Sequence, residues 1–516
     1  MQSAERVIKN TGFLYGKMVI TIFISLYSTR LILNALGVAD YGIFNLVGGV
    51  IAMLSFINGA MIIATQRYLS FYIGAGDDHK LKSVFISSIV LHLVISLIIV
   101  LLLEIAGFFL FDGVLNIPVD RIGTAKVIFH FMIISTFFTI NAVPYDASIN
   151  SHENMLFDSL LGIFESILKL GIAIWLVYSE IDKLILFGLL TAVSTIIIRI
   201  IKGIYCSRKY IECRINLKSR VQTGLLKEML SFAGWNLFGL LCSVLSNQGL
   251  AILLNLFFGV VVNAAYGIAN QVNANLRSFS SNMIRAILPQ ITKSEGSGDR
   301  ERMLRLSVLA SKMSFFLLAF FAIPIIIEMH FILKIWLKTV PDNALIFCQL
   351  TLILSLVYQI TVGMMAAITT VGEIKAYQIV VGIVQLFTLP VAWALMKFGL
   401  PALYVFVGSI FIEFIAGGLK IWFAHKIAGL DLNDFLIKTL FNSTLTVVIT
   451  AILALTIRFL LHEGFLRAIL VGTTTSLSLL LLCKYIALTS EENGKIKELL
   501  LSFYFNLRKK IVIRPN

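Results

Sequence analysis

Long apolar segments separated by short polar ones recur along the whole chain. Each is near or above the ~20 residues that a helix needs to cross the hydrocarbon core of a bilayer. They fall at 11–36, 41–66, 84–110, 122–148, 157–178, 183–205, 229–258, 262–288, 303–327, 343–370, 374–396, 400–424, 436–458 and 465–487. The pattern predicts an all-α polytopic membrane protein with about 14 transmembrane helices.

The first two apolar segments form the unit on which the chain is built. Between them lie Gly37 and Asp40, in the sequence Gly-Val-Ala-Asp-Tyr-Gly. A glycine can end one helix, and a carboxylate can cap the free amides of the next. Residues 10–77 are therefore predicted to form a transmembrane hairpin with a polar tail.

This hairpin pattern recurs once, about 222 to 225 residues later. Gly234 aligns with Gly12, and Tyr266-Gly267-Ile268 aligns with Tyr41-Gly42-Ile43. The tail Gly296-Ser297-Gly298-Asp299 aligns with Gly74-Ala75-Gly76-Asp77. A second repeated segment aligns Ile140–Phe157 with Ile360–Tyr377, and within it Glu153 aligns with Glu373. The matches keep their order, which predicts a duplicated half of six helices.

The repeat divides the chain into five parts. We expect an N-terminal six-helix bundle at 1–205, a basic cytoplasmic linker at 206–228, and a C-terminal six-helix bundle at 229–424. Two additional transmembrane helices follow at 425–487, and a basic cytoplasmic tail at 488–516. The tail is amphipathic, so we expect it to lie on the inner membrane surface.

Composition and charge agree with a membrane protein. The chain of 516 residues is 58% hydrophobic and 14% charged, against about 25% charged in soluble proteins. The first apolar run is too long for a cleavable signal peptide and contains Lys17 and Arg30, so we expect it to remain as a helix.

The net charge of +14 is concentrated in alternate loops. One set of loops carries roughly 30 Lys and Arg and the other roughly 8, and the positive-inside rule places the richer set and both termini in the cytoplasm. This placement favours contact with anionic membrane lipids over binding of nucleic acid.

Polar side chains form stripes along the first and eighth apolar segments. The first stripe holds Asn10, Lys17, Thr21 and Ser28; the second holds Asn263, Tyr266, Asn270, Arg277 and Ser281, with Arg285 beside it. Such stripes should face protein or water. The hairpins that begin each repeat are thus the most polar part of the membrane region.

Basic residues inside spans suggest an ion, a substrate or a gate, because inserting one costs about 2.5 to 3.5 kcal/mol. Arg277 lies deep in its segment, whereas Lys17 either faces a cavity or snorkels to the interface. Arg67 and Arg285 lie near cytoplasmic helix ends, where snorkelling is the alternative. Arg30 lies toward the outer side, where packing, an outer gate and substrate contact are all open.

Three sets of carboxylates fall inside or beside spans. Glu165 and Lys169 have the favourable i, i+4 order, and Asp158 shares their face. The pair either neutralises itself or opens as a gate when substrate replaces one partner, and Glu413 with Lys420 has the same two interpretations. Asp146 is a candidate titrating group or a helix-end hydrogen-bond acceptor.

No catalytic or metal-binding arrangement is found in the sequence. It contains no P-loop, its seven histidines lack metal-ligand spacing, and its five cysteines form no disulfide framework or metal motif. We therefore expect a transporter and not an enzyme, without a cofactor and without direct use of ATP.

Several short motifs in the first hairpin resemble those of a known superfamily. They are Asn10-Thr11-x-x-Leu14-Tyr15, Leu26-Tyr27-Ser28-Thr29-Arg30, Leu36-Gly37-x-x-Asp40-Tyr41-Gly42-Ile43, Gly48-Gly49 and Ala64-Thr65-Gln66-Arg67. They look like the polysaccharide-export branch of the multidrug, oligosaccharidyl-lipid and polysaccharide exporter superfamily, and they are similar to bacterial O-antigen repeat-unit flippases. The resemblance is dense over residues 10–82 and otherwise one of architecture.

The resemblance implies a flippase of the bacterial cytoplasmic (inner) membrane. It would move an undecaprenyl-pyrophosphate-linked oligosaccharide to the outer leaflet by alternating access, driven by a sodium or proton gradient. It also implies polysaccharide polymerase and chain-length machinery as partners.

Pyrophosphate requires Arg, Lys and amide donors, and sugars require amide, hydroxyl and aromatic groups. We expect substrate contacts from Lys17, Arg67, Tyr266, Asn270, Gln271, Asn273, Arg277 and Arg285, and gating or coupling from Arg30, Asp146, Glu165 and Lys169. Lys17 aligns with Gly239, so the two halves would not bind the anion symmetrically.

Three other interpretations stay open. A multidrug exporter of the same superfamily would attract cations with cavity carboxylates, which the excess of basic residues in the first hairpins disfavours. A flippase for lipid-linked peptidoglycan precursors shares the helical plan. A membrane scaffold for glycan-assembly enzymes would need no transport path.

Overall fold

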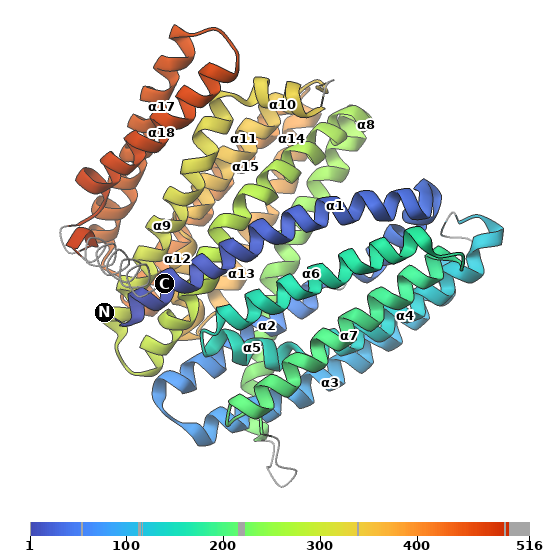
Figure 1. Ribbon diagram of the computed structural model, residues 1–516. Helices are drawn as coiled ribbons and strands as arrows, with labels where there is room; N and C mark the ends of the chain where they lie inside the picture. The colour runs from blue at the N-terminus through green and yellow to red at the C-terminus, as the bar shows by residue number, and fades with distance from the viewer. Residues whose placement is uncertain are drawn as a thin grey trace, which may run out of the picture. The chain divides into compact units, whose positions relative to one another are not determined.

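The computed structural model describes residues 2–52, 55–111, 115, 117–214, 222–337, 340–489 and 492–494. Every regular element in these ranges is a helix, which confirms the predicted all-α class (Figure 1). Most of the predicted basic tail and the middle of the predicted linker, residues 215–221, lie outside the described residues.

The α-helices of the described chain, in order, are α1 (Gln2–Ala52), α2 (Ser55–Ala75), α3 (Asp78–Phe109), α4 (Ile122–Asn141), α5 (Val143–Ser151), α6 (Met155–Tyr178), α7 (Lys183–Lys209), α8 (Thr223–Gly296), α9 (Arg300–Ile327), α10 (Met329–Leu337), α11 (Ala344–Gln359), α12 (Val362–Val371), α13 (Lys375–Leu386), α14 (Thr388–Lys397), α15 (Leu403–Ala428), α16 (Leu432–Asp434), α17 (Asn442–Leu460) and α18 (Phe465–Leu482). Short 3-10 or π segments lie at Val119–Arg121, Phe435–Phe441 and Cys483–Ala487.

The described residues contain 11 helices long and apolar enough to cross a membrane, or 12 when the bent pair α11 and α12 counts as one span. The predicted number of fourteen is therefore not confirmed. Two places account for the difference. Helix α8 runs for 74 residues through two predicted spans, and the second predicted span is divided between the short helix Ala39–Ile51 and α2.

Both α1 and α8 break at a glycine in the same unusual conformation. Gly37 has φ 77° and ψ 170°, and Gly259 has φ 81° and ψ −173°. This region is essentially restricted to glycine, because a Cβ atom would strain the backbone there. The two glycines are 222 residues apart, which is the predicted repeat spacing. Each break divides one long helix into two segments.

The second repeated segment, Ile140–Phe157 with Ile360–Tyr377, also has matching helix boundaries in the two halves. Helix α5 ends at Ser151 and α12 ends at Val371, while α6 begins at Met155 and α13 at Lys375. Both pairs of positions are 220 residues apart, as Ile140 and Ile360 are. The same short helix followed by the same longer helix thus occurs in each half, which supports the duplication.

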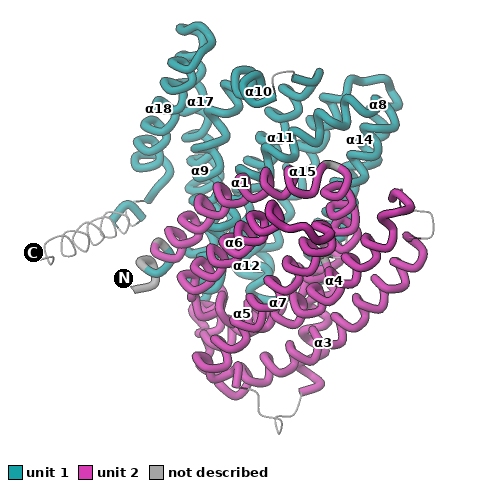
Figure 2. The backbone as a smooth tube through the Cα atoms, turned by 45° about the vertical axis from the view of Figure 1, so that its right-hand side comes forward, with its two compact units in different colours: residues 1–8, 241–291, 300–516 teal, residues 9–240, 292–299 magenta. Residues whose placement is uncertain are grey.

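The described chain divides into two compact units (Figure 2). Unit 2 contains residues 9–240 and 292–299. In it α4 packs against α3 and α7, α2 against α5, and α6 against α7. An apolar core of unit 2 is built from Ile43, Val47, Ile99, Leu103, Ile117, Ala125, Ile128, Phe129, Ile133, Ile140 and Leu184. Large apolar side chains remain exposed along α3 and α6, as lipid-facing helices require.

Unit 1 contains residues 1–8, 241–291 and 300–516. Helix α9 packs against α12, α11 against α15, and the additional helices α17 and α18 against each other and against α9. A buried ion pair of 2.8 Å between Arg467 and Glu328 connects α18 to the residue that follows α9. The limit between the units falls at residue 240 inside α8, whereas the predicted second bundle starts at 229; that bundle division stays a prediction.

Candidate substrate and coupling sites

Unit 2 holds a network of charged side chains inside its helices, and three of its members, Lys17, Asp146 and Asp158, were singled out from the sequence. Lys17 Nζ of α1 lies 3.1 Å from Asp158 Oδ2 of α6, and the Asp158 side chain is only 6% exposed. Lys202 of α7 approaches Asp158 Oδ1 at 3.7 Å. Lys17, predicted as a substrate ligand, is therefore paired with a carboxylate in this structure.

The same lysine joins Asp158 to Asp146. Lys202 Nζ donates to Asp146 Oδ1, and Arg199 lies 3.9 Å from the other carboxylate oxygen of Asp146. We call Lys17, Asp146, Asp158, Arg199 and Lys202 the unit 2 network. It brings three bases and two carboxylates together from α1, α5, α6 and α7.

Local backbone features place these side chains. The chain breaks at Ala142 between α4 and α5, and Pro144 occupies the first turn of α5, where its missing N–H costs nothing. Asp146 follows in the same turn, where the helix dipole favours a negative charge. On α6, Gly162 makes room for Lys17, since a Cβ at Gly162 would lie 2.3 Å from Lys17 Cε.

The other predicted gating residues lie on the same helices. Lys169 Nζ lies 2.9 Å from Glu165 Oε1, so the i, i+4 pair forms as its spacing predicts. Arg30 is exposed on α1. Arg67, predicted as a substrate contact, lies on α2, and its guanidinium is 4.7 Å from the ring centroid of Tyr68 and 4.9 Å from that of Phe232, which indicates cation–π contact.

Unit 1 holds a second charged group around one aromatic ring. Arg277 Cζ of α8 lies 4.5 Å from the ring centroid of Tyr358, and Lys420 Nζ of α15 lies 4.4 Å from the same centroid. Lys420 also pairs with Glu413 at 2.6 Å, and its side chain is only 2% exposed. We call Arg277, Tyr358, Glu413 and Lys420 the unit 1 cluster.

The charge of Arg277 is not balanced locally. Within the described ranges, no carboxylate oxygen lies within 4.0 Å of its guanidinium, whereas Lys420 has Glu413. The ring of Tyr358 fixes the guanidinium by its π face and leaves the N–H donors free of ionic partners. A planar cation held in this way can bind a phosphate or carboxylate through two parallel hydrogen bonds.

The remaining predicted ligands lie along α8. Tyr266 is buried against Phe406, with its hydroxyl 3.5 Å from the carbonyl oxygen of Asn247. Asn273 Oδ1 accepts a hydrogen bond of 2.5 Å from Ser355. Half-buried or exposed positions are held by Asn270, Gln271 and Arg285. Their assignment as ligands stays a prediction.

Sequence reasoning missed three residues that complete these groups. Arg199, Lys202 and Tyr358 are not among the site residues that the sequence predicts. Arg199 and Lys202 lie three residues apart, and thus on one face of a helix, which was the available signal. Nothing in the sequence pairs Lys202 with Asp146, which is 56 residues away.

The ends of the two repeated hairpins touch through glycines. A Cβ on Gly74 would lie 2.2 Å from the carbonyl oxygen of Lys293, and one on Gly296 would lie 2.0 Å from that of Phe71. Positions 71 and 293 are related by the same 222-residue spacing as 74 and 296. The contact is thus reciprocal, as in a two-fold interface, and Lys293 adds an ion pair with Glu153.

No protein-family model matches the sequence. A relative from Bacillus subtilis strain 168, the uncharacterized membrane protein EpsK, is 22% identical over 305 residues, or 58% of this chain. The match spans 59% of the length of that relative.

Solved structures of transporters share the fold. A multidrug resistance MATE family transporter of the MOP superfamily, in its outward-facing conformation, matches with a TM-score of 0.68 and 14% identity, over 82% of this chain and 96% of its own. A MOP superfamily transporter from Pyrococcus furiosus, described by a binding pocket of reverse polarity that suggests a different function, matches with a TM-score of 0.66 and 14% identity, over 83% and 98%. The chain thus has the MATE transporter fold.

Proposed function

We propose that this protein exports a lipid-linked oligosaccharide whose head group is a pyrophosphate, such as an undecaprenyl-pyrophosphate-linked repeat unit of a surface polysaccharide. It would do so across the bacterial cytoplasmic membrane by alternating access. The shared fold supports transport, and the motif resemblance in the first hairpin supports the polysaccharide-export branch of that superfamily.

The observation that carries the proposal is the sign of the charge inside the helices. The unit 1 cluster has two bases and one carboxylate, and the unit 2 network has three bases and two carboxylates. Each group thus has a formal charge of +1, and every carboxylate in them lies against a base. Keeping such charge in a membrane is costly unless an anion joins it.

In this proposal Arg277 binds the pyrophosphate. Arginine matches phosphate oxygens through two parallel hydrogen bonds, which lysine cannot reproduce. Tyr358 orients the guanidinium, and Glu413 holds Lys420 on the same ring. Asn270, Gln271 and Asn273 follow the same helix and would supply amide groups for sugar hydroxyls.

The unit 2 network is the proposed coupling element. Lys202 bridges Asp146 and Asp158, and Asp158 also holds Lys17, so neutralising Asp158 by a proton or by sodium weakens the hold on both lysines. A released Lys17 would then be available to an anionic group. Coupling to a sodium or proton gradient is thereby linked to substrate binding through one lysine.

Multidrug export is the second candidate, because a multidrug resistance transporter shares the fold. Exporters of cationic drugs need carboxylates that are not already neutralised by a base. The unit 1 cluster and the unit 2 network have the opposite balance, which favours an anionic substrate. A peptidoglycan-precursor flippase would also carry a pyrophosphate lipid, so the sugar distinguishes that alternative.

Ligand binding to the purified protein tests the sign of the substrate charge. We expect a short-chain polyprenyl pyrophosphate at 100 times its dissociation constant to stabilise the fold by about 2.7 kcal/mol, measured as a rise in melting temperature. We expect a lipophilic cationic dye to give no rise. Stabilisation by the dye alone would favour the multidrug interpretation and contradict the proposal.

The contact between the hairpin ends gives a prediction about alternating access. Gly74→Val should reduce export about tenfold or more, because the new side chain collides with the backbone at Lys293, and overpacking of this kind costs about 1 to 3 kcal/mol. Export by reconstituted vesicles and the folded fraction are measured together.

Gly171→Val on α6 is the matched control, since a Cβ there meets nothing within 4 Å. It should transport at the wild-type rate. Wild-type export by the Gly74→Val protein would show that close approach of the two hairpin ends is not part of the transport cycle.

A further inference from the structure

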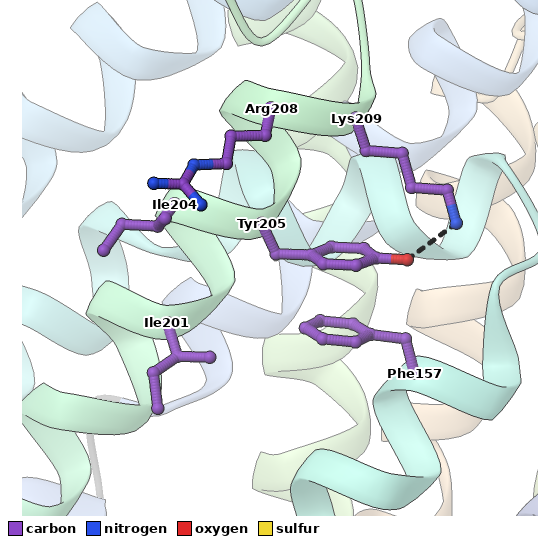
Figure 3. Close-up of a pocket in the computed structure, with 6 residues that line it drawn as sticks. All are labelled: Phe157, Ile201, Ile204, Tyr205, Arg208 and Lys209. Atoms are coloured by element: carbon purple, nitrogen blue, oxygen red, sulfur yellow. Dashed lines mark hydrogen bonds between the residues drawn. The ribbon is translucent and has the colours of Figure 1, made fainter.

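A surface pocket of about 420 Å³ lies where α6 begins and α7 ends (Figure 3). It belongs to neither charged group of the proposed function. Its lining residues are Phe157, Ile201, Ile204, Tyr205, Arg208 and Lys209. One end is therefore apolar and the other basic, and no acidic residue lines it.

The floor of the pocket is a fixed aromatic platform. Phe157 stacks on Tyr205 with ring centroids 3.6 Å apart and an angle of 7° between the rings. The Tyr205 hydroxyl accepts hydrogen bonds from Asn154 Nδ2 at 2.6 Å and from Lys209 Nζ at 2.7 Å. Figure 3 shows Lys209 bent toward this hydroxyl and Arg208 on the other side of the ring.

A second layer holds Asn154 in place. Asn154 Nδ2 also donates to the hydroxyl of Tyr210, whose ring stacks on His152 at 4.1 Å. Burial raises the pKa of Tyr210 above its ordinary value, so its hydroxyl stays protonated at neutral pH. His152 is in turn bonded to the buried Glu212 at 2.7 Å. The platform is thus supported by packing and hydrogen bonds on its inner side.

The two basic residues of the pocket lack an anion. In the part of the chain that the structure describes, neither Arg208 nor Lys209 has a carboxylate within 4.0 Å, and both are exposed. Lys209 is held near the platform by Tyr205 alone. An anionic head group at this end of the pocket would complement their charge.

The depth of the pocket identifies the kind of anion. Phe157 lies two residues into the span Met155–Tyr178, and Arg208 and Lys209 end the span Lys183–Lys209. At 1.5 Å per residue, Ile201 lies about 12 Å below Lys209, toward the hydrocarbon. Exposed Ile197, Ile200 and Ile204 extend this apolar face along α7.

We propose that this pocket binds an anionic phospholipid, with the head group at the basic end of the pocket that Arg208 and Lys209 form and an acyl chain along the isoleucines of α7. The aromatic platform at the level of the head group suits the membrane interface, where such rings are enriched. The apolar face explains why the ligand is a lipid and not a soluble phosphate. The site is separate from the exported substrate, so it stands even if that substrate is different.

Native mass spectrometry of the purified full-length protein tests this proposal. Phosphatidylglycerol, phosphatidylcholine of the same chains, and soluble glycerol 3-phosphate are titrated separately. We expect phosphatidylglycerol to bind at one saturable site, and the R208Q/K209Q variant to bind it about 30-fold more weakly. Ile204→Ala should weaken the binding of phosphatidylglycerol to a smaller extent, because a contact with the acyl chain is lost.

K80Q/K82Q is the matched control, because it removes the same charge from exposed positions on α3. It should bind phosphatidylglycerol like the wild type. Equal weakening in both double variants would show general charge attraction and overturn the site. Equal affinity for phosphatidylcholine, or for glycerol 3-phosphate, would overturn the choice of an anionic lipid.

Discussion

Arg277→Gln should reduce translocation of a pyrophosphate-linked oligosaccharide about 100-fold while the amount of folded protein stays unchanged. Hydrogen bonds to charged groups contribute about 1.5 to 3 kcal/mol each, and two parallel bonds to a phosphate are lost together. Arg277 stands on the ring of Tyr358 without a carboxylate partner among the described residues, so its removal leaves no buried charge unpaired. Translocation is measured in reconstituted vesicles.

Two variants separate anion binding from a general loss of charge. Arg277→Lys keeps the charge but not the planar fork, so we expect an intermediate rate. Lys397→Gln removes a cation that stands on Trp393 at 4.6 Å, the same kind of contact at the end of α14, and should leave the rate unchanged. If Arg277→Gln transported as well as the wild type, the substrate anion would have to bind elsewhere.

Lys202→Met should destabilise the protein by about 3 kcal/mol or more. The substitution leaves Asp146 and Asp158 without the base that bridges them, and removing one partner of a buried ion pair costs about 3 to 5 kcal/mol. Thermal unfolding is followed with a thiol-reactive dye, because Cys206, Cys213, Cys242 and Cys348 are all buried in the folded chain.

A double-mutant cycle identifies the cause of this loss. Adding Asp146→Asn to Lys202→Met removes the carboxylate that Lys202 contacts most closely, so the double variant should recover part of the lost stability. Lys169→Met is the comparison, since Lys169 is exposed and pairs with Glu165 in a single helix. We expect this substitution to lower the free energy of unfolding by less than about 1 kcal/mol. Strictly additive effects of the two substitutions would mean that Lys202 and Asp146 are not coupled.

Local features of the sequence were sufficient for much of the fold. Apolar segment lengths predicted the helical membrane class, and the glycine between the first two segments predicted a helix break. The structure adds a second break at Gly259, whose conformation matches that of Gly37 and which was not predicted, although it lies at the repeat offset. The number of spans was not confirmed, because apolar length alone does not show whether a turn interrupts a helix or only bends it.

The candidate sites were predicted less completely, for a physical reason. The Glu165–Lys169 pair depends on helical spacing and was visible in the sequence. The Lys17–Asp158 pair joins residues 141 positions apart, and the contact of Arg277 with Tyr358 depends on how α8 and α11 pack. Such contacts follow from tertiary packing, which hydrophobic periodicity does not specify. Lys17 was predicted to face a cavity or to snorkel, and neither alternative included a carboxylate partner.

The most direct measurement follows lipid movement in vesicles that contain the purified protein. A polyprenyl-pyrophosphate-linked oligosaccharide is placed in one leaflet, and its arrival in the other is detected with an impermeant glycan-binding protein. We expect movement that depends on Arg277 and on an imposed sodium or proton gradient, together with no accumulation of a lipophilic cation. Gradient-driven accumulation of the cation without movement of the oligosaccharide lipid would contradict an exporter built around positive charge.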